Sequence, residues 1–399
     1  MNKHLGLILR LSIAAAGIAF IVYNLNWSDR VDLPPGYVVG PDIEGGPDGA
    51  SFYVLDKRED ALLVGGRADP WAHIPEPVWL AKSAIGVEPD QPRFRPSVMT
   101  TFREAKVGLL LLGGLCFAPS FLIGSLRWFM LMRARGMEVA YGRSFRLTMV
   151  GVFFNLCFPG ATGGDVMKAY YAAKHSNQRG TAVMTVVVDR FCGLLGLVLL
   201  VSLLGLTMLD QETPRKITLA MWGLLVGLLV SGYVYTHPHL RRASGFDWLL
   251  SKLPGGGLIG GVDRAIVAYC GHKRQIALGV LMSIPIHVCI ALSLACAAYA
   301  FGVKQPLLFM IGTIPVAALV GALPISGPLG LGAMDVTAVA LISDPARATT
   351  HQVAMMLVIY RLYAVFYGLL GSLGLMKGDI HLHPPQAQGL DETESGQIV

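Results

Sequence analysis

The sequence has few charged residues. Only 15% of its 399 residues are Asp, Glu, Lys or Arg, whereas 53% are hydrophobic. An ordinary soluble domain has about 25% charged and about 45–50% apolar residues. The mean hydropathy of +0.55 points in the same direction. This shortage of charge argues against a soluble enzyme, a disordered scaffold or a nucleic-acid-binding protein, and it favours a polytopic membrane protein.

Paired cysteines and familiar catalytic motifs are also missing. None of the six cysteines lies in the long polar segment 28–104, and no two of them form a CxxC pair, so we expect neither disulfides nor a zinc site. The sequence shows no HExxH pair, P-loop, GxSxG elbow or dinucleotide fingerprint in a strand–turn–helix context. We therefore predict a protein without metal, cofactor or enzymatic activity.

The basic residues that are present gather in two segments. The net charge of +6 then reports cytoplasmic loops rather than nucleic-acid binding, because Lys and Arg concentrate on the cytoplasmic side of membrane proteins. The first segment follows a hydrophobic stretch and holds a single acid, Glu138, among Arg127, Arg133, Arg135, Arg143 and Arg146. The second, 237–275, contains Arg241, Arg242, Lys252, Arg264, Lys273 and Arg274. Both are predicted to be cytoplasmic loops.

Hydrophobic stretches near the 20 residues that a spanning helix needs predict an all-α polytopic fold with about six spans. Residues 1–27 are predicted to form an uncleaved anchor helix, with Tyr23 and Trp27 at the membrane interface. The other spans are predicted at 107–126, 181–209, 217–235, 276–300 and 353–376. The membrane domain would cover 105–378, and 379–399 would form a polar tail. We expect both termini in the cytoplasm and the protein in the cell membrane.

Residues 28–104 form an insert of different composition. The insert contains ten prolines and more acids than bases, which places it outside the cytoplasm. Apolar patches at 51–55 and 61–64 predict a few strands. The favoured interpretation is a Pro-rich, partly ordered loop, and the alternative is a small domain that binds a ligand or partner.

Two segments are too short or too broken to be ordinary spans. Residues 147–158 stop at Pro159 and a glycine-rich turn, and residues 307–323 stop at Pro324 and a similar turn. An acid and an arginine follow each turn, 25 residues apart in one case (190 − 165) and 26 in the other (361 − 335). Counting membrane crossings predicts two re-entrant hairpins in an inverted repeat, the first opening to the cytoplasm and the second to the exterior. Inverted repeats with broken helices are a recurring plan of transporters.

The charges inside these segments are the candidate site. A charge at the bilayer centre costs about 2.5–3.5 kcal/mol or more, so it persists when paired or facing a polar cavity. Either internal salt bridges or a cavity for a charged ligand would explain Asp165, Asp189, Arg190, Asp335 and Arg361. An anionic headgroup fits the second reading, because arginine grips phosphate and a helix N-terminus attracts anions.

Glycines precede both acids. Asp165 is predicted to be an N-cap, with Gly163 and Gly164 letting a ligand approach the backbone and with Lys168 adding positive charge. In the second unit, Asp335 is predicted to play the same N-capping role, and Gly330 and Gly332 to open the backbone to a ligand. The alternative is that the glycines only permit tight helix packing. His287, within a span, is read as a packing residue.

The motifs around these charges carry a family resemblance. Arg127-Trp128, the run 158–165 and the run 189–194 resemble the lysylphosphatidylglycerol synthase transmembrane-region family, also called flippase-like. The runs 323–326 and 330–332 are similar to that family's second signature, in which Glu often stands at the position of Asp335. The resemblance covers about residues 105–378 and implies a lipid-handling membrane domain. In fused members this domain translocates the lipid that a separate synthase domain aminoacylates, and we do not expect aminoacyl transfer from the present sequence.

These observations favour a flippase-like transporter that moves an anionic or amphiphilic lipid headgroup, on a phospholipid or a polyprenyl carrier, between leaflets. Its partners would be the membrane lipid and a separate lipid-modifying enzyme, without nucleic acid. Two other hypotheses stay open at this point. One is an intramembrane lipid-modifying enzyme, and the other is a non-transporting scaffold that presents the insert 28–104.

Overall fold

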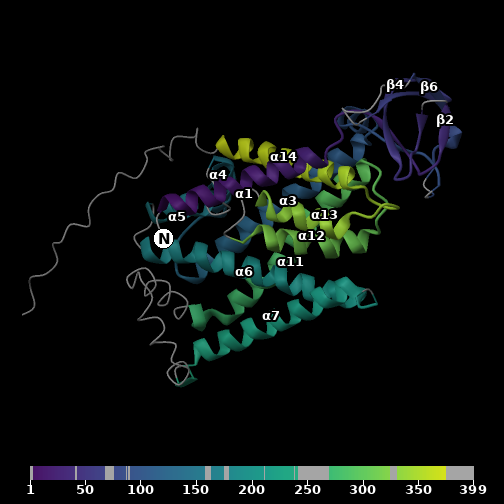
Figure 1. Ribbon diagram of the computed structural model, residues 1–399. Coiled ribbons are helices and arrows are strands. Elements are labelled where there is room, and N and C mark those ends of the chain that lie inside the picture. The colour runs from purple at the N-terminus through teal and green to yellow at the C-terminus, as the bar shows by residue number, and fades with distance from the viewer. Residues whose placement is uncertain are drawn as a thin grey trace, which may run out of the picture.

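The computed structural model describes residues 3–40, 43–67, 76–86, 88, 90–157, 163–174, 179–210, 212–237, 239–240, 269–323 and 330–373. A bundle of helices carries a small β domain at one end (Figure 1). Five described helices are long and apolar enough to cross a membrane, at Val107–Ala134, Gly180–Gly205, Arg215–Tyr235, Lys273–Ala300 and Thr350–Ser372. The predicted all-α polytopic membrane fold is confirmed, and these five helices correspond to five of the predicted spans.

The membrane part consists of two units with the same order of elements. The first contains α3 (Val107–Ala134), α4 (Tyr141–Cys157), α5 (Gly163–Lys174) and α6 (Arg179–Gly205). The second contains α11 (Lys273–Ala300), α12 (Leu307–Gly321), α13 (Ala333–Ile342) and α14 (Thr350–Ser372). The two opening helices are 28 residues each and carry a proline at the same place, Pro119 and Pro285 (119 − 107 = 285 − 273). Each unit is thus a long helix, a broken hairpin and a second long helix.

The two units are inverted with respect to each other. The amide of Lys106, just before α3, donates to the carbonyl of Ala300 at the end of α11. At the other end of the pair, the Tyr269 hydroxyl donates to the Leu131 carbonyl late in α3, 3.1 Å away. The helices α3 and α11 therefore run antiparallel, and the hairpins that follow them open at opposite ends of the bundle.

Contacts between the units follow the same two-fold pattern. Helix α3 packs along α11, α4 packs on α14, and α12 packs on α6. If the two units are exchanged, the contact between α3 and α11 maps onto itself. The contact between α4 and α14 maps onto the contact between α12 and α6. Fully buried alanines of α11, at Ala291, Ala295 and Ala298, let its neighbours approach closely, as small residues do between membrane helices.

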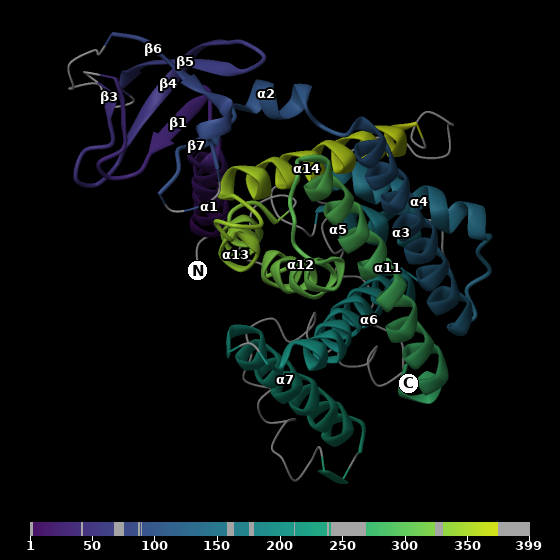
Figure 2. The same cartoon turned by 90° about the vertical axis from the view of Figure 1, so that its right-hand side faces the viewer.

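Two further helices lie outside the units. Helix α1 (Lys3–Asn24) packs on α13 and α14, with Gly17 and Ile21 on its buried face. Helix α7 (Glu212–Thr236) packs on α6 (Figure 2). Helix α1 corresponds to the predicted first span. Within the part of the chain that the structure describes, its apolar stretch is Ala15–Asn24. Most of the predicted loop 237–275 and the whole tail 379–399 lie outside the described residues.

Helices α3 and α4 both extend into the segment whose basic residues predict a cytoplasmic loop. Helix α3 runs to Ala134, eight residues beyond the predicted end at 126, so Arg127 lies inside the bundle. Helix α4 likewise begins at Tyr141, six residues before the predicted 147. Arginine does not end a helix, and its long side chain can reach either a buried partner or the membrane surface.

The insert forms an antiparallel sheet of β6 (Val78–Ala81), β5 (Ala61–Arg67), β4 (Ala50–Lys57), β1 (Arg30–Leu33) and β7 (Arg93–Arg95), in that spatial order. The strands β2 (Val38–Gly40) and β3 (Ile43–Glu44) make a separate pair. The two predicted strands are confirmed as β4 and β5. The favoured reading as a partly ordered loop is wrong for the described part, because alternating residues build one buried face, at Val31, Leu33, Phe52, Leu62 and Val64. Its prolines stand between strands, where a missing N–H costs little.

The β domain lies beside the start of α14 (Figure 2), and polar contacts fasten it to the bundle. His351, in the first turn of α14, accepts the amide N–H of Asn26 on Nδ1 at 3.0 Å, and its Nε2 lies 3.0 Å from the Thr101 hydroxyl in α2 (Val98–Arg103). Nearby, the carboxylate of Asp29 accepts the Ser97 amide at 2.5 Å and pairs with Lys57 at 2.6 Å. The β domain is therefore held against the start of α14.

Candidate functional site

The first predicted acid–arginine pair is formed. Asp165 is the third residue of α5, and Arg190 lies on α6. The Arg190 Nη2 donates to Asp165 Oδ1 at 2.7 Å, and its Nε pairs with Oδ2. Such a two-pronged contact is the strong form of this ion pair. The side chain of Arg190 is nevertheless 52% exposed, against 16% for Asp165, so the guanidinium can still contact a ligand.

The second predicted pair is formed in the same way. The Arg361 Nη2, from α14, donates to the Asp335 Oδ1 at 2.5 Å, and Asp335 is the third residue of α13. The other carboxylate oxygen accepts the N–H of Gly332 at 2.9 Å. Gly330 and Gly332 have φ of 75° and 89°, which favour glycine because other residues are strained there. Asp335 therefore stabilises the start of its helix from the third helical position, and Gly332 takes the N-cap position predicted for Asp335.

The two pairs differ in accessibility. The Asp335 side chain is fully buried and that of Arg361 is 15% exposed, and the buried Nε of Arg361 has no hydrogen-bond partner among the described residues. Helix α1 closes over this pair, because Gly17 lies against the backbone of Gly332. In the first unit α5 packs on α4 and α6, and Val166, next to Asp165, is exposed. One pair is open and the other is enclosed.

A buried cluster of charges lies beside the open pair. Asp189, next to Arg190, accepts from Arg127 Nε at 2.8 Å and pairs with Lys168 Nζ at 3.2 Å. Arg127 also donates to the Ser283 hydroxyl at 2.6 Å, and the Lys168 ammonium lies 4.0 Å from the centre of the Trp128 ring. All three charged residues are buried. Lys168 and Asp189, predicted to face a ligand, instead belong to an internal network that joins α3, α5, α6 and α11.

Sequence reasoning missed Arg127 as part of this cluster. The density of arginines from Arg127 onward predicts one cytoplasmic loop. The apolar sequence nevertheless continues through Leu131 and Met132, and both residues are buried. That continuing apolar run was the signal that the helix extends past Arg127. A buried arginine then needs an anion, and Asp189 on the next long helix supplies it.

Gly164, directly before Asp165, has a packing role. The Gly164 amide donates to the side-chain oxygen of Asn155 at 2.8 Å, and a Cβ on Gly164 would overlap the carbonyl oxygen of Gly151. Helix α5 already begins at Gly163, so Asp165 lies in its first turn instead of at the predicted N-cap. Residues 158–162 and 324–329, which hold both prolines and most of the two turns, lie outside the described residues.

The face of α6 beside Arg190 is open toward α7. The two helices meet at the far end of α6, where Trp222 donates to the Ser202 carbonyl at 3.0 Å and Gly205 lies against Thr218. Positions 187, 191 and 194 lie on the same helical face as Gly205, given 100° per residue. All three, Val187, Phe191 and Leu194, are exposed. The two helices separate toward the end that carries Arg190 (Figure 2).

Two remaining predictions concern single residues and metals. His287 lies in α11, and its Nε2 is 3.2 Å from the Gly193 carbonyl, which agrees with its reading as a packing residue. Among the described residues, no cluster of three His, Cys, Asp or Glu side chains is suited to hold a metal ion.

Comparison with known proteins completes this description. Residues 96–371 match the family described as lysylphosphatidylglycerol synthase TM region, a stretch that contains both helical units. No curated protein and no solved structure matches the chain. The match covers more than half of the chain, as the motifs around both acid–arginine pairs had indicated. The chain is therefore a multi-pass membrane protein with a lipid-related role, and it belongs to the lysylphosphatidylglycerol synthase TM region family.

Proposed function

We propose that the protein is a flippase-like transporter that moves a lipid headgroup between the two leaflets of the cell membrane. The observation that carries this proposal is the pair of equivalent Asp–Arg contacts, placed at the broken hairpins of two inverted units, one open and one enclosed. Transporters of this plan bind substrate at the interface of inverted repeats and expose it to one side at a time.

The open pair offers complementary groups to an anionic or amphiphilic headgroup. A phosphate would bind the Arg190 guanidinium, which presents several N–H donors in a plane, and would compete with Asp165 for them. An amine or aminoacyl group on the same headgroup would contact the released Asp165 carboxylate. The neighbouring Asp189 stays paired with Arg127 and Lys168, so this exchange leaves the buried cluster intact.

The exposed face of α6 gives the lipid a lateral route. The headgroup would enter between α6 and α7 while the acyl chains remain in the bilayer, next to Phe191 and Leu194. Transport then requires that the enclosed pair opens in turn, with α1 moving away from Gly332. The described arrangement is one end state of that cycle.

Orientation and partners form part of the proposal. Arg133, Arg135, Arg143 and Arg146 support a cytoplasmic mouth for the first hairpin under the positive-inside rule. Both termini would then lie in the cytoplasm and the β domain outside. The lipid is moved without chemical change, and a separate enzyme that modifies the headgroup is the expected partner. Mass spectrometry of lipids incubated with the protein should show unaltered masses.

The test is a translocation assay in liposomes that contain the purified protein. Fluorescent phosphatidylglycerol, fluorescent phosphatidylethanolamine and a labelled polyprenyl phosphate would each be followed by quenching from outside. We expect faster translocation of at least one of them than in empty liposomes, and loss of this rate in Arg190→Ala. Arg215→Ala, an exposed arginine at the start of α7, is the matched control and should keep the wild-type rate. Rates equal to those of empty liposomes for every lipid contradict the proposal.

The folded insert favours one alternative, a scaffold that presents the β domain to a partner. The domain has its own buried face and a fixed junction to α14. Residues 30–95 would be replaced by a short linker, and the shortened protein would be compared with the full chain in the same liposomes. Translocation should survive under the transport proposal, whereas a scaffold function would be lost.

A further inference from the structure

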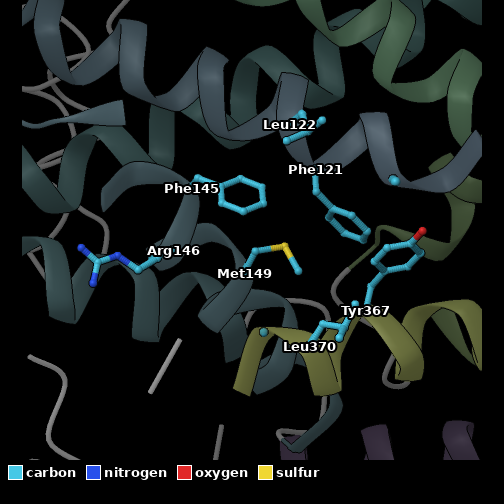
Figure 3. A pocket seen from close by; sticks show the side chains of 9 residues that line it. Phe121, Leu122, Phe145, Arg146, Met149, Tyr367 and Leu370 are labelled. Atoms are coloured by element: carbon cyan, nitrogen blue, oxygen red, sulfur yellow. The ribbon is translucent and has the colours of Figure 1, made fainter. Parts of the chain in front are cut away.

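An apolar groove lies on the other side of the first unit from α6 and α7. It has a volume of about 330 Å³ and lies between α3, α4 and α14, within the range of about 300–1,000 Å³ that is typical of ligand pockets. Its walls are formed by Ala118, Phe121, Leu122, Phe145, Met149, Tyr367, Leu370 and Gly371, with Arg146 at one end (Figure 3). None of these residues belongs to the two acid–arginine pairs or to the buried charge cluster.

The groove is held open by fixed side chains. Helices α4 and α14 pack closely at Gly368 and Gly371, which lie against Leu156 and the backbone of Met149. Tyr367 also connects α14 to α3. The Tyr367 hydroxyl donates to the Gly114 carbonyl at 2.8 Å, and its ring lies 5.2 Å from that of Phe121. The walls are therefore fixed before any ligand enters.

The residues at the equivalent place in the second unit are buried. When the units are aligned on Pro159 and Pro324 (324 − 159 = 165), Phe145 corresponds to Met310 and Met149 to Ile314. Both Met310 and Ile314 are fully buried. The same alignment places Ile311 opposite Arg146. At this equivalent place the second unit therefore has neither the open lining nor the basic residue of the first.

The charge of Arg146 is available at the mouth of the groove. Its aliphatic stem borders the cavity, and its guanidinium points away from Phe145 and Met149 (Figure 3). Arg146 lies about 7.5 Å along the axis from the start of α4 at Tyr141, by the helical rise. Arg133, Arg135 and Arg143 lie in the same stretch of chain, with Glu138 as its single acid. An arginine at this depth reaches toward the membrane surface, where lipid phosphates lie.

We propose that this groove binds an anionic diacyl phospholipid, with one acyl chain against Phe121, Phe145 and Met149 and the phosphate on Arg146. An apolar cavity with a single cation at its mouth matches one chain and one anionic headgroup. This site does not rest on the proposed transport activity, because it lies apart from both acid–arginine pairs.

The test is native mass spectrometry of the full chain, delipidated in detergent and titrated with phosphatidylglycerol or phosphatidylethanolamine. We expect one tightly bound phosphatidylglycerol and an apparent Kd about tenfold higher for Arg146→Gln, as the loss of a charged hydrogen bond of about 1.5 kcal/mol implies. Arg143→Gln, the matched control on the same helix, should change the Kd less than twofold. Leu122→Trp should fill the groove and abolish the tight site, whereas Leu112→Trp, on another face of α3, should not.

Three results would overturn the inference. The first is equal affinity for both lipids, together with no effect of Arg146→Gln. The second is retention of the tight site in Leu122→Trp, provided that this variant elutes as a single peak in detergent. The third is a species of twice the protein mass that Leu122→Trp disrupts, which would assign the groove to a second copy of the chain.

Discussion

Replacing Asp189 by Asn should destabilise the protein more than any other single change in the charged region. Asp189 is the anion that bonds to both Arg127 and Lys168, at 2.8 and 3.2 Å. The substitution leaves two buried cations without a counter-charge, and breaking a buried pair in this way costs about 3–5 kcal/mol. That loss is comparable to much of the stability of a typical domain, about 5–15 kcal/mol.

The assay is reversible unfolding in mixed micelles, in which the denaturing detergent is increased stepwise and intrinsic Trp fluorescence is followed. Asp165→Asn is the matched control, because its partner Arg190 is half-exposed whereas both partners of Asp189 are buried, so the loss should be smaller than for Asp189→Asn. A triple replacement of Arg127, Lys168 and Asp189 by apolar residues of similar size should recover most of the lost stability, since no unpaired charge then remains. A loss below about 1 kcal/mol for Asp189→Asn would refute the network.

Three further predictions concern the hairpins and the β domain. Gly164→Val should destabilise the first hairpin by about 1–3 kcal/mol, because the side chain would meet the Gly151 carbonyl, whereas Gly142→Val, where there is open space, should change the unfolding curve little. Gly332→Ala should cost about 1–2 kcal/mol from its left-handed backbone, measured in the same assay. Partial burial opposes ionisation of Asp29, but its bonds to Lys57, Ser97 and Thr100 outweigh burial and lower its pKa below the model-compound value of 3.8. Asp29 therefore stabilises the junction above pH 3.8, and this contribution is lost as the pH falls through the lowered pKa. Amide exchange at Ser97 should accordingly be faster in Asp29→Asn than in the native protein at pH 7. The difference between the two proteins should vanish in strong acid. Equal exchange rates at pH 7 would show that Asp29 does not hold the junction.

The sequence grouped each acid with its arginine because this grouping depends on local spacing, and it left open whether the two charges pair or face a ligand. Asp165 and Arg190, like Asp335 and Arg361, stand on consecutive helices of a repeated unit, and a separation of 25 or 26 residues returns the chain to the same depth. The inverted order of the units followed from alternating crossings. Their unequal accessibility did not follow, because it depends on where α1 packs.

Other features depended on contacts between distant segments. Arg127 was assigned to a loop because the positive-inside rule reads charge density and does not detect a distant partner such as Asp189. The prolines of the insert suggested incomplete order, and their position between strands became evident only with the sheet. The role of Gly164 is set by its distance from the Gly151 carbonyl, which no local pattern encodes.

The most direct test of the central claim is the translocation rate of Arg361→Ala in liposomes. Arg361 is enclosed with Asp335 under α1, so an opening that serves only the first unit would not need it. If both units alternate in presenting a headgroup, Arg361→Ala should reduce the rate to that of empty liposomes, as Arg190→Ala does, while the protein remains monodisperse in detergent. Translocation by Arg361→Ala at the wild-type rate would contradict the account.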